Sequence, residues 1–410
     1  MPTEGREFFT VRTVSEALAE FLPSHRTGTE VVNLDAAYRR VPAADIIARE
    51  ALPGFERSTV DGYAVRARDT FGASDAIPAY LRVIGAVRMG APAEDRLGPD
   101  TAVAVPTGGM LPAAADAVVM IEHTTEAIAG TVEVVRPVAP GEGVVRRDED
   151  VAAGATIAAR GRPLRPQDVA LLAACGVTDV SVHAAPRVTI LATGDEVVTP
   201  DTPSLVPGQV RDALSVSIGA LVREGGGEPA PAMIIPDDRH VLERALSDAV
   251  ERSDLVVVCA GSSVGARDET AGAIAALPNA RTWCHGLAIK PGKPTLLASS
   301  DGIPIIGLPG NPRSALVVFR LIGLPILGRV GGCTVPHRSG AVSARLTRDL
   351  PSAAGRLDVV QVRLDGKLAE PIFGPSALLS VLSAADGYVI VPEDATGLSA
   401  GEPVDVTLYA

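Results

Sequence analysis

The chain has 410 residues and a mass of 42.1 kDa. This is about three times the size of an ordinary domain, so we expect several domains. Hydrophobic residues make up 47% and charged residues 21%, which excludes a largely disordered or collagen-like chain. Aromatic residues make up only 3%, and acidic residues outnumber basic ones by 49 to 37. This balance argues against a non-specific nucleic-acid-binding protein, which needs positive charge and stacking side chains.

The amino terminus and the apolar runs predict a cytoplasmic protein that does not enter a membrane. Glu4, Glu7 and Glu16 lie in an amino-terminal segment that lacks the apolar core of a secretory signal. The longest apolar run, residues 315–327, is interrupted by Arg320 and is too short to cross a bilayer. The four cysteines form no CxxC pair and the six histidines lack metal-ligand spacing, so we expect neither a disulfide framework nor a zinc site.

The first part of the chain predicts a discontinuous helical linker domain, residues 1–50 and 151–185. Apolar residues follow a helical period in residues 13–22 and, more weakly, in residues 33–49. The later part holds a helical pattern over residues 165–175, which Gly176 closes.

The insert between these two parts, residues 51–150, predicts a β-rich domain. Its short apolar runs are punctuated by glycine and proline, and almost no helical pattern occurs. The expected strands cover residues 80–87, 102–105, 117–121 and 131–135.

Residues 186–332 predict an α/β domain with a mostly parallel sheet. Apolar runs alternate with helical patterns, and such strands are buried on both faces, with ligands gathering beyond their carboxyl ends. The expected strands are 188–191, 255–258 and 303–308, and the expected helices are 215–224, 239–251 and 314–321. Residues 333–410 return to short strands and predict a small carboxyl-terminal β domain, with strands at 341–346, 359–364, 387–391 and 404–408.

Two features of the α/β segment predict a site for an oxyanion. Asn311 suits the N-cap of a helix and Pro312 its first position, so the helix end would point backbone N–H groups outward. Lys290 and Lys293 are two of only three lysines among 37 basic residues, which indicates a place where a compact ammonium group is needed. An ordinary capped helix and a solvated turn are the alternative interpretations.

Several carboxylates lie in loops where packing does not require them. They are Asp61, Asp150, Glu196, Asp212 and Asp268, and each alone could be a solvated loop acid. Glu196 and Asp268 follow separate strands of the expected sheet, so they could converge at one edge. Carboxylates that meet a phosphate site imply a hard cation, most simply Mg²⁺.

A rival motif favours a hydrolase. Residues 261–265 follow an apolar strand and match G-x-S-x-G, which would make Ser263 a nucleophile. Only His285 and His337 lie downstream, and no HGGG-like loop lies upstream, so this interpretation is the weaker one.

Motifs that span almost the whole chain occur in the order found in one known family. They are S-T-V-D-G-Y-A-V (58–65), V-P-T-G (105–108) followed by A-D-A-V-V (115–119), T-G-D-E (193–196), G-Q-V-R-D (208–212), S-V-G-A-R-D (263–268), A-I-K-P-G-K-P (288–294), G-L-P-G-N-P-R-S-A (307–315) and S-A-L-L-S (376–380). In sequence and spacing the chain resembles the molybdopterin molybdenumtransferase family, which includes the carboxyl-terminal domain of gephyrin.

The resemblance implies an enzyme of the last step of molybdenum cofactor biosynthesis. Such an enzyme takes adenylylated molybdopterin and molybdate, cleaves the pyrophosphate link, and inserts molybdenum at the dithiolene with release of AMP. Mg²⁺ assists. The resemblance also implies a homodimer with a shared site, in which the α/β domain of one subunit faces the second and fourth domains of the other.

The resemblance further implies roles for individual residues. The acids Asp61, Asp150, Glu196, Asp212 and Asp268 would be catalytic, and Asp61, Glu196 and Asp268 would hold the metal ion. The lysines would offset the charge of the substrate. The full implied substrate-binding set is Thr107, Gly194, Gly261, Ser263, Gly265, Lys290, Lys293, Pro309, Gly310, Asn311, Pro312 and Ser376.

The chain departs from the family pattern inside its motifs. The altered positions are Val145, Asp148, Ala213, Leu214, Ala266 and Gly286. Lost hydrogen bonds or charges at a polyanion site each cost about 1–3 kcal/mol. A diverged paralogue that binds a pterin, a nucleotide or a protein partner without inserting metal is therefore the alternative hypothesis.

Overall fold

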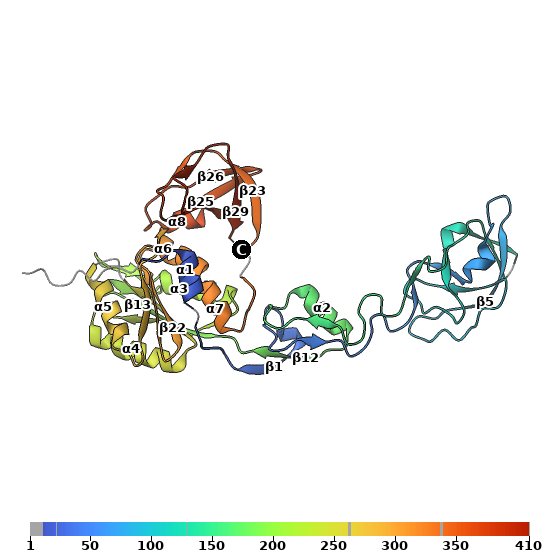
Figure 1. The fold of residues 1–410 in the computed structure, drawn as a ribbon, viewed down its shortest axis with the longest axis horizontal. Helices are drawn as coiled ribbons and strands as arrows, with labels where there is room; N and C mark the ends of the chain where they lie inside the picture. The colour runs from blue at the N-terminus through green and yellow to red at the C-terminus, as the bar shows by residue number, and fades with distance from the viewer. Residues whose placement is uncertain (1–10, 22, 129, 261–263, 337–338, 410) are drawn as a thin grey trace, which may run out of the picture.

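The computed structural model describes residues 11–21, 23–128, 130–260, 264–336 and 339–409. Figure 1 shows an elongated molecule. A unit of helices around β13 and β22 forms one end, and the carboxyl-terminal strands β23 to β29 lie against it. The linker with β1, β12 and α2 lies in the middle, and a unit that contains β5 forms the far end.

The α/β unit is built on a seven-stranded sheet in the order β16-β13-β18-β22-β21-β19, with β17 also pairing with β13. The pairs of β13 with β16, β17 and β18, and of β18 with β22, are parallel, and only the β21 and β19 edge is antiparallel. The strands are β13 Arg187–Thr193, β16 Glu228–Pro229, β17 Met233–Ile235, β18 Leu255–Ala260, β19 Arg281–His285, β21 Leu296–Ser300 and β22 Ile303–Pro309.

Helices cover both faces of this sheet because its strands are apolar on both sides. In β18, Leu255 and Val257 face a core shared with α3, α6 and α7, while Val256 and Val258 face a core shared with α4 and α5. The helices are α3 Leu214–Glu224, α4 Arg239–Arg252, α5 Val264–Ala275, α6 Pro312–Val318 and α7 Leu324–Val330, with a π-helical turn, η4, at Phe319–Gly323.

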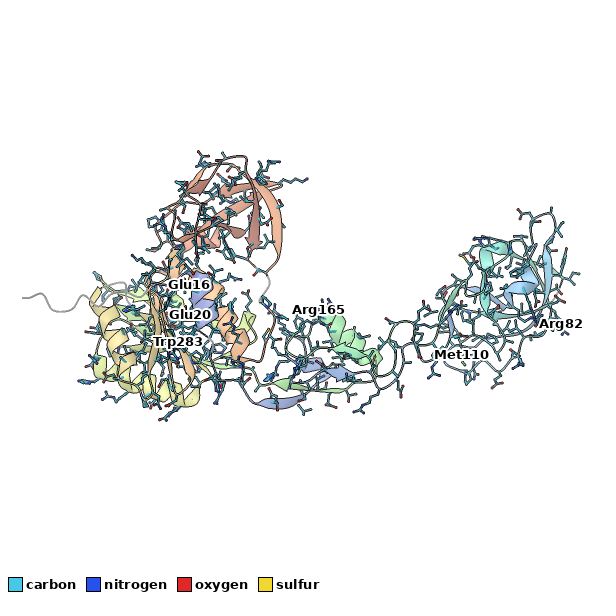
Figure 2. The ribbon with its side chains drawn as sticks, viewed as in Figure 1. Glu16, Glu20, Arg82, Met110, Arg165 and Trp283 are labelled. Carbon is cyan, nitrogen blue, oxygen red and sulfur yellow. The ribbon has the colours of Figure 1, made fainter. Side chains whose placement is uncertain are left out.

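The first helix, α1 Val14–Glu20, forms as predicted but packs on the α/β unit instead of the linker. The Thr13 hydroxyl and the Glu16 carboxylate form a capping box at its start. Val14, Ala17 and Phe21 enter the core of the α/β unit, where the Phe21 ring lies 5.8 Å from that of Trp283. Figure 2 shows Glu16, Glu20 and Trp283 at this helix. The helix therefore packs on the α/β unit, although the sequence pattern groups this segment with the linker domain.

The linker is less helical than predicted. The prediction of a second helix over residues 33–49 is wrong, because only the short 3₁₀ turn η1 Leu34–Ala36 forms there. Pro42 prevents a continuous helix, and the chain extends to pair β1 with β12 and β2 with β11. The expected later helix is present as α2 Pro166–Ala174, closed by Gly176 with φ +71°. The strands are β1 Thr29–Asn33, β2 Ile46–Ile47, β11 Thr156–Ala158 and β12 Asp179–His183.

One buried carboxylate makes the stability of the linker pH-dependent. Asp168 accepts hydrogen bonds from Arg162 and Arg165 at 2.8 Å. The bond from Arg165 lowers the pKa of Asp168 to about 2 against the opposing effect of burial. A depressed pKa contributes stability above the unfolded value, about 3.9, and the contribution disappears as the pH falls towards 2.

We expect Asp168→Asn to lower the free energy of unfolding at pH 7 by about 2 kcal/mol. The difference in the free energy of unfolding between the variant and the wild type should shrink below pH 4 and vanish near pH 2. Urea titrations at several pH values measure this. Asp179→Asn, an exposed change in the same unit, is the control and should alter stability little at any pH. A difference in the free energy of unfolding between wild type and Asp168→Asn that stays constant down to pH 2 would contradict the lowered pKa of Asp168.

The two remaining units are β-rich. A six-stranded sheet β7-β4-β6-β5-β9-β8 forms the far end of the molecule, and another, β20-β25-β26-β23-β29-β27, forms the carboxyl-terminal unit. The first contains β4 Gly62–Val65, β5 Ala79–Ala86, β6 Thr101–Val105, β7 Ala117–Met120, β8 Thr124–Ile128 and β9 Thr131–Val134. The second contains β20 Ile289–Lys290, β23 Ala341–Leu346, β25 Leu357–Asp365, β26 Leu368–Pro371, β27 Gly387–Val391 and β29 Pro403–Leu408, with α8 Leu379–Ser383.

Smaller elements complete these units. The sequence patterns missed β4 and β8, and β4 is central because it pairs with both β6 and β7. The short pairs are β3 Arg57–Ser58 with β10 Val144–Val145, β14 Val197–Val198 with β15 Val210–Arg211, and β24 Leu350–Pro351 with β28 Gly397–Leu398; the 3₁₀ turns are η2 Ala67–Thr70 and η3 Ile121–His123. The exact domain boundaries stay a prediction.

Candidate functional site

The carboxyl ends of three parallel strands bring together several predicted site residues. In register, Ala192 of β13 lies beside Cys259 of β18, which lies beside Leu308 of β22. The loops that follow these strands therefore leave the same edge of the sheet. Gly194 and Glu196 follow β13, Gly265 and Asp268 lie on α5 after β18, and Gly310 to Pro312 follow β22. Gly261 and Ser263 lie outside the described residues, as does the position of the Asp268 side chain.

The loop after β13 requires glycine at position 194. Gly194 has φ +140°, and a Cβ added there would lie 2.5 Å from Oε2 of Glu196. The Glu196 side chain thus folds back over Gly194, while the Val197 N–H donates to the Gly194 carbonyl at 3.1 Å. Glu196 is exposed, and among the described residues its carboxylate has no hydrogen-bond or ion-pair partner. This carboxylate is available to a cation or to ordered water.

Asp212 lies next to this loop but has a structural bond of its own. The Val210 N–H donates to the Glu196 carbonyl at 2.8 Å and joins the two segments. Asp212 is buried, and its Oδ1 accepts from the Ser215 N–H at 2.9 Å at the start of α3. Burial raises the pKa of Cys259, and the Asp212 charge adds to this effect, so Cys259 is an unreactive thiol.

The start of α6 is placed as predicted, with one difference. Asn311 occupies the N-cap and Pro312 the first turn, but the Asn311 side chain makes no cap hydrogen bond. The Arg313 N–H donates to the Ser376 carbonyl at 3.1 Å, and its guanidinium donates to the Gly374 carbonyl at 2.8 Å. These bonds bring the predicted residue Ser376 from the carboxyl-terminal unit to the helix start.

Lys290 and Lys293 lie in a loop between the α/β unit and the carboxyl-terminal strands. β20, which ends at Lys290, pairs with β25, and Lys290 Nζ lies 3.8 Å from Oδ2 of Asp358. Asp358 is buried and also accepts a 2.8 Å hydrogen bond from Arg356. Lys293 is exposed. Sequence reasoning missed Asp358, although a carboxylate within an apolar strand pattern is a usable signal.

Sequence reasoning also missed a contact between the amino terminus and this loop. The Arg12 N–H donates to the Gly286 carbonyl at 3.1 Å, and the Ala288 N–H donates to the Arg12 carbonyl at 2.7 Å. On the opposite side, the Leu287 N–H donates to the Lys293 carbonyl at 2.9 Å. The backbone at Arg12 therefore holds the segment that carries the two lysines.

A second group of predicted residues lies in the far β unit. Oδ1 of Asp61 accepts a 2.8 Å hydrogen bond from the Thr107 N–H, and Asp61 is exposed. The Gly108 N–H donates to the Ser58 carbonyl at 2.8 Å, so the two loops are fastened to each other. Asp61 and Thr107 were predicted from separate motifs, and the structure brings them together.

Asp150 follows the loop of residues 146–149, and its N–H donates to the Leu52 carbonyl at 3.1 Å. The loop contains Asp148 with φ +67°, a left-handed conformation in which aspartate is tolerated and glycine is favoured. A shallow cavity at this loop has a volume of about 460 Å³ and is lined by Pro140, Gly141, Val144, Arg146, Arg147, Asp148 and Glu149.

One chain does not bring the two groups of residues together. Asp61 and Thr107 belong to the unit that contains β5, and Glu196 follows β13 at the opposite end of the molecule (Figure 1). Within the described ranges, no cluster of three or more His, Cys, Asp or Glu side chains could hold a metal ion. No helix in the described part of the chain is long and apolar enough to cross a membrane.

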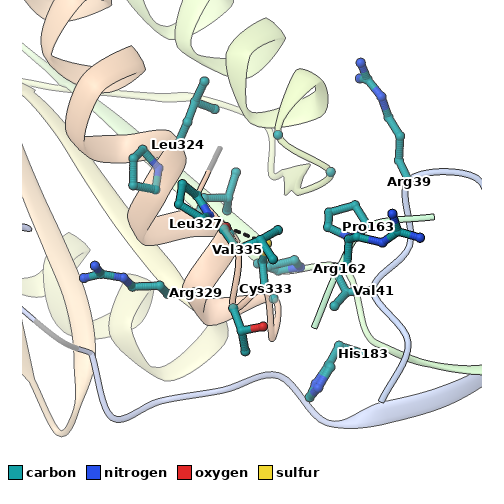
Figure 3. Close-up of a pocket in the computed structure, with 18 of the residues that line it drawn as sticks. Arg39, Val41, Arg162, Pro163, His183, Leu324, Leu327, Arg329, Cys333 and Val335 are labelled. Atoms are coloured by element: carbon teal, nitrogen blue, oxygen red, sulfur yellow. Dashed lines mark hydrogen bonds between the residues drawn. The ribbon is translucent and has the colours of Figure 1, made fainter. Parts of the chain in front are cut away.

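A further cavity contains none of the predicted site residues. It has a volume of about 1150 Å³ and lies where the linker meets α7. Figure 3 shows Arg39, Arg162 and His183 on linker segments and Leu324 and Arg329 on α7. This cavity is distinct from the strand ends.

Family models match three consecutive parts of the chain. They are the MoeA N-terminal region (domain I and II) over residues 12–176, the probable molybdopterin binding domain over residues 189–329, and the MoeA C-terminal region (domain IV) over residues 343–409. The fold is thus that of a protein with a probable molybdopterin binding domain and the MoeA arrangement of domains.

Full-length relatives define the family more closely. The chain is 34% identical to molybdopterin molybdenumtransferase 2 of Mycobacterium tuberculosis, over 97% of this chain and 99% of the relative. It is 32% identical to the molybdopterin molybdenumtransferase of Haemophilus influenzae, over 93% and 94% of the two chains. A molybdopterin biosynthesis MoeA protein of Pyrococcus horikoshii matches with a TM-score of 0.84 and 32% identity, over 97% of this chain and 100% of that one. The chain belongs to the molybdopterin molybdenumtransferase family.

Proposed function

We propose that this protein inserts molybdenum from molybdate into adenylylated molybdopterin and releases AMP. The observation that carries the proposal is the meeting of three features at one sheet edge: the loop of Gly194 and Glu196, the start of α6 at Pro312, and the adjoining lysine loop. Pro312 has no N–H and the Arg313 N–H already bonds Ser376, so the helix dipole and the lysines supply the positive potential. Both suit a substrate with a pyrophosphate link.

Mg²⁺ fits the donor chemistry of the exposed acids. Within the described residues the Glu196 carboxylate has no partner, and Asp61 keeps one oxygen beyond its bond to Thr107. Oxygen donors of this kind are what Mg²⁺ prefers. Glu196, Asp268 and Asp61 would hold the ion, which neutralises phosphate charge when it is bound.

The separation of Asp61 from Glu196 favours a homodimer with a shared site. In a two-fold dimer of elongated chains, the strand ends of one copy can face the far β unit of the other, so each site receives residues from both copies. Lys290 and Lys293 then orient the phosphates, and Asp61 with Thr107 closes the site from the second copy. Cytoplasmic location remains a prediction.

A paralogue that binds without inserting metal is the second candidate. The observation that favours it is at the start of α3, where Ala213 offers no side-chain cap and the buried Ser215 hydroxyl has no partner in the described structure. Two of the positions that depart from the family pattern, Ala213 and Leu214, are apolar and directly follow Asp212.

The test is AMP release by the purified protein supplied with adenylylated molybdopterin, molybdate and Mg²⁺. We expect release that requires molybdate, together with formation of the cofactor. Asp61→Asn should abolish both, whereas Arg68→Gln, a change on an exposed side chain of the same unit, should not. Binding of the adenylylated pterin without AMP release would overturn the proposal in favour of the paralogue.

A prediction about the amino terminus follows from this function. Arg12→Pro removes the N–H that bonds Gly286, so we expect the KM for adenylylated molybdopterin to rise about tenfold, equivalent to one lost hydrogen bond, with kcat unchanged. Steady-state kinetics measure this. Arg12→Ala keeps both backbone bonds and is the matched control. Equal KM values for the two variants would contradict a role for the backbone contact.

A further inference from the structure

Arg313 is a buried arginine where the α/β unit meets the carboxyl-terminal unit. It is the second residue of α6 and is only 8% exposed. Helix α8 of the carboxyl-terminal unit lies against α6 at this junction (Figure 1). Within the described residues the Arg313 guanidinium forms no ion pair, and its Nε has no hydrogen-bond partner.

The burial of this cation has an electrostatic cost that packing does not explain. A buried charge needs a counter-ion or a full set of hydrogen bonds, and in the described part of the chain Arg313 has neither. Burial accordingly lowers the pKa of Arg313. An apolar side chain of similar length would suit the same position better. Positions that break a folding rule without compensation are typical of functional sites, so the bonds that Arg313 does form indicate its role.

The bonds of Arg313 fasten one loop of the carboxyl-terminal unit, residues 372–378, between β26 and α8. The Arg313 N–H donates to the Ser376 carbonyl at 3.1 Å, and its Nη1 donates to the Gly374 carbonyl at 2.8 Å. Gly374 also packs against α8, because a Cβ added there would lie 2.9 Å from Cγ2 of Val381. The loop is therefore held against both helices, with Ser376 at the start of α6.

We propose that Arg313 is a positioning residue that holds Ser376 at the start of α6, so that the two units contact one substrate together. The buried guanidinium acts through the loop and does not itself touch the substrate. Ser376 is predicted to bind adenylylated molybdopterin, so this role rests on the proposed function. It adds to that function a fixed spacing between the groups that follow β22 and those of the carboxyl-terminal unit.

Arg313→Met tests this role in the full chain, because methionine fills the space but donates no hydrogen bond. We expect the affinity for adenylylated molybdopterin, measured by calorimetric titration without molybdate, to fall about tenfold, equivalent to one lost hydrogen bond. The free energy of unfolding should stay the same or rise, because the variant removes a buried cation without a counter-ion. Arg313→Lys keeps a donor for the Gly374 carbonyl and should restore most of the affinity. Hydrogen exchange of the Leu378 N–H, which donates to the Pro375 carbonyl at 3.1 Å, should be faster in Arg313→Met.

Arg345→Met is the matched control. Arg345 is exposed and donates to the Gly401 carbonyl at 2.8 Å within the carboxyl-terminal unit, so this variant loses the same kind of bond away from the loop and should leave the affinity unchanged. Unchanged affinity in Arg313→Met would overturn the positioning role and leave the proposed function intact. A parallel loss of affinity and of the free energy of unfolding would show a purely structural role and would also overturn it. A wild-type protein that binds adenylylated molybdopterin without releasing AMP would contradict the proposed function alone, and one that binds none would overturn both.

Discussion

A mixed dimer of Asp61→Ala and Glu196→Ala chains is expected to regain about half of the wild-type metal-insertion activity, although each variant alone is inactive. Asp61 lies in the far β unit and Glu196 at the strand ends, and one chain keeps them apart (Figure 1). If each site uses Asp61 from one copy and Glu196 from the other, the mixed dimer has one site with both carboxylates intact. Its second site lacks both.

Co-expression of the two variants with different affinity tags isolates the mixed dimer, and AMP release is then measured per dimer. The matched control combines Asp61→Ala with Thr107→Ala. Both changes lie in the same unit, joined by the 2.8 Å hydrogen bond, so each site of that dimer keeps one defect and no activity returns. Failure of the first pair, with both chains folded and dimeric, would show that the site is not shared.

Gly62→Ala is expected to destabilise the far β unit by about 3 kcal/mol or more, the range found for severe steric overlap in a core. Gly62 begins β4, the strand that lies between β6 and β7. A Cβ added there would lie 1.9 Å from the Val119 carbonyl oxygen. Backbone cannot move away without breaking the strand pairing, and Asp61 is the preceding residue.

Urea unfolding followed by circular dichroism, with limited proteolysis of the far unit, measures this effect. Gly98→Ala is the control in the same unit, because nothing lies within 4 Å of an added Cβ there. It should change stability by less than about 1 kcal/mol. Equal stability of the two variants would contradict the close approach of β4 to β7.

Much of the candidate site was predictable because its signals are local. The apolar runs at 188–191, 255–258 and 303–308 correspond to β13, β18 and β22, and a parallel sheet places the residues after its strands at one edge. The N-cap position of Asn311 and the loop position of Glu196 follow from the same short segments. The charge of Glu196 and the hydrogen-bonding groups of Asn311 could be predicted without knowing which distant segments lie beside them.

Other features could not be predicted because they depend on contacts between distant segments. Residues 33–49 had a weak helical period, but pairing of β2 with β11 joins segments about 110 residues apart and outweighs local propensity. Likewise, Asp358 meets Lys290 only because β20 pairs with β25. No local pattern contains the partner in either case.

The amino-acid order alone therefore specifies the alternation of strands and helices, the glycine loops, and the types of charged group available to a substrate. The tertiary structure decides that α1 packs on the α/β unit, that Arg12 holds the lysine loop, and that Asp61 and Glu196 lie in separate units. The physical reason is the separation along the sequence over which each interaction acts. Periodicity and capping act over a few residues, whereas packing and strand pairing depend on surfaces that meet only after the chain has folded.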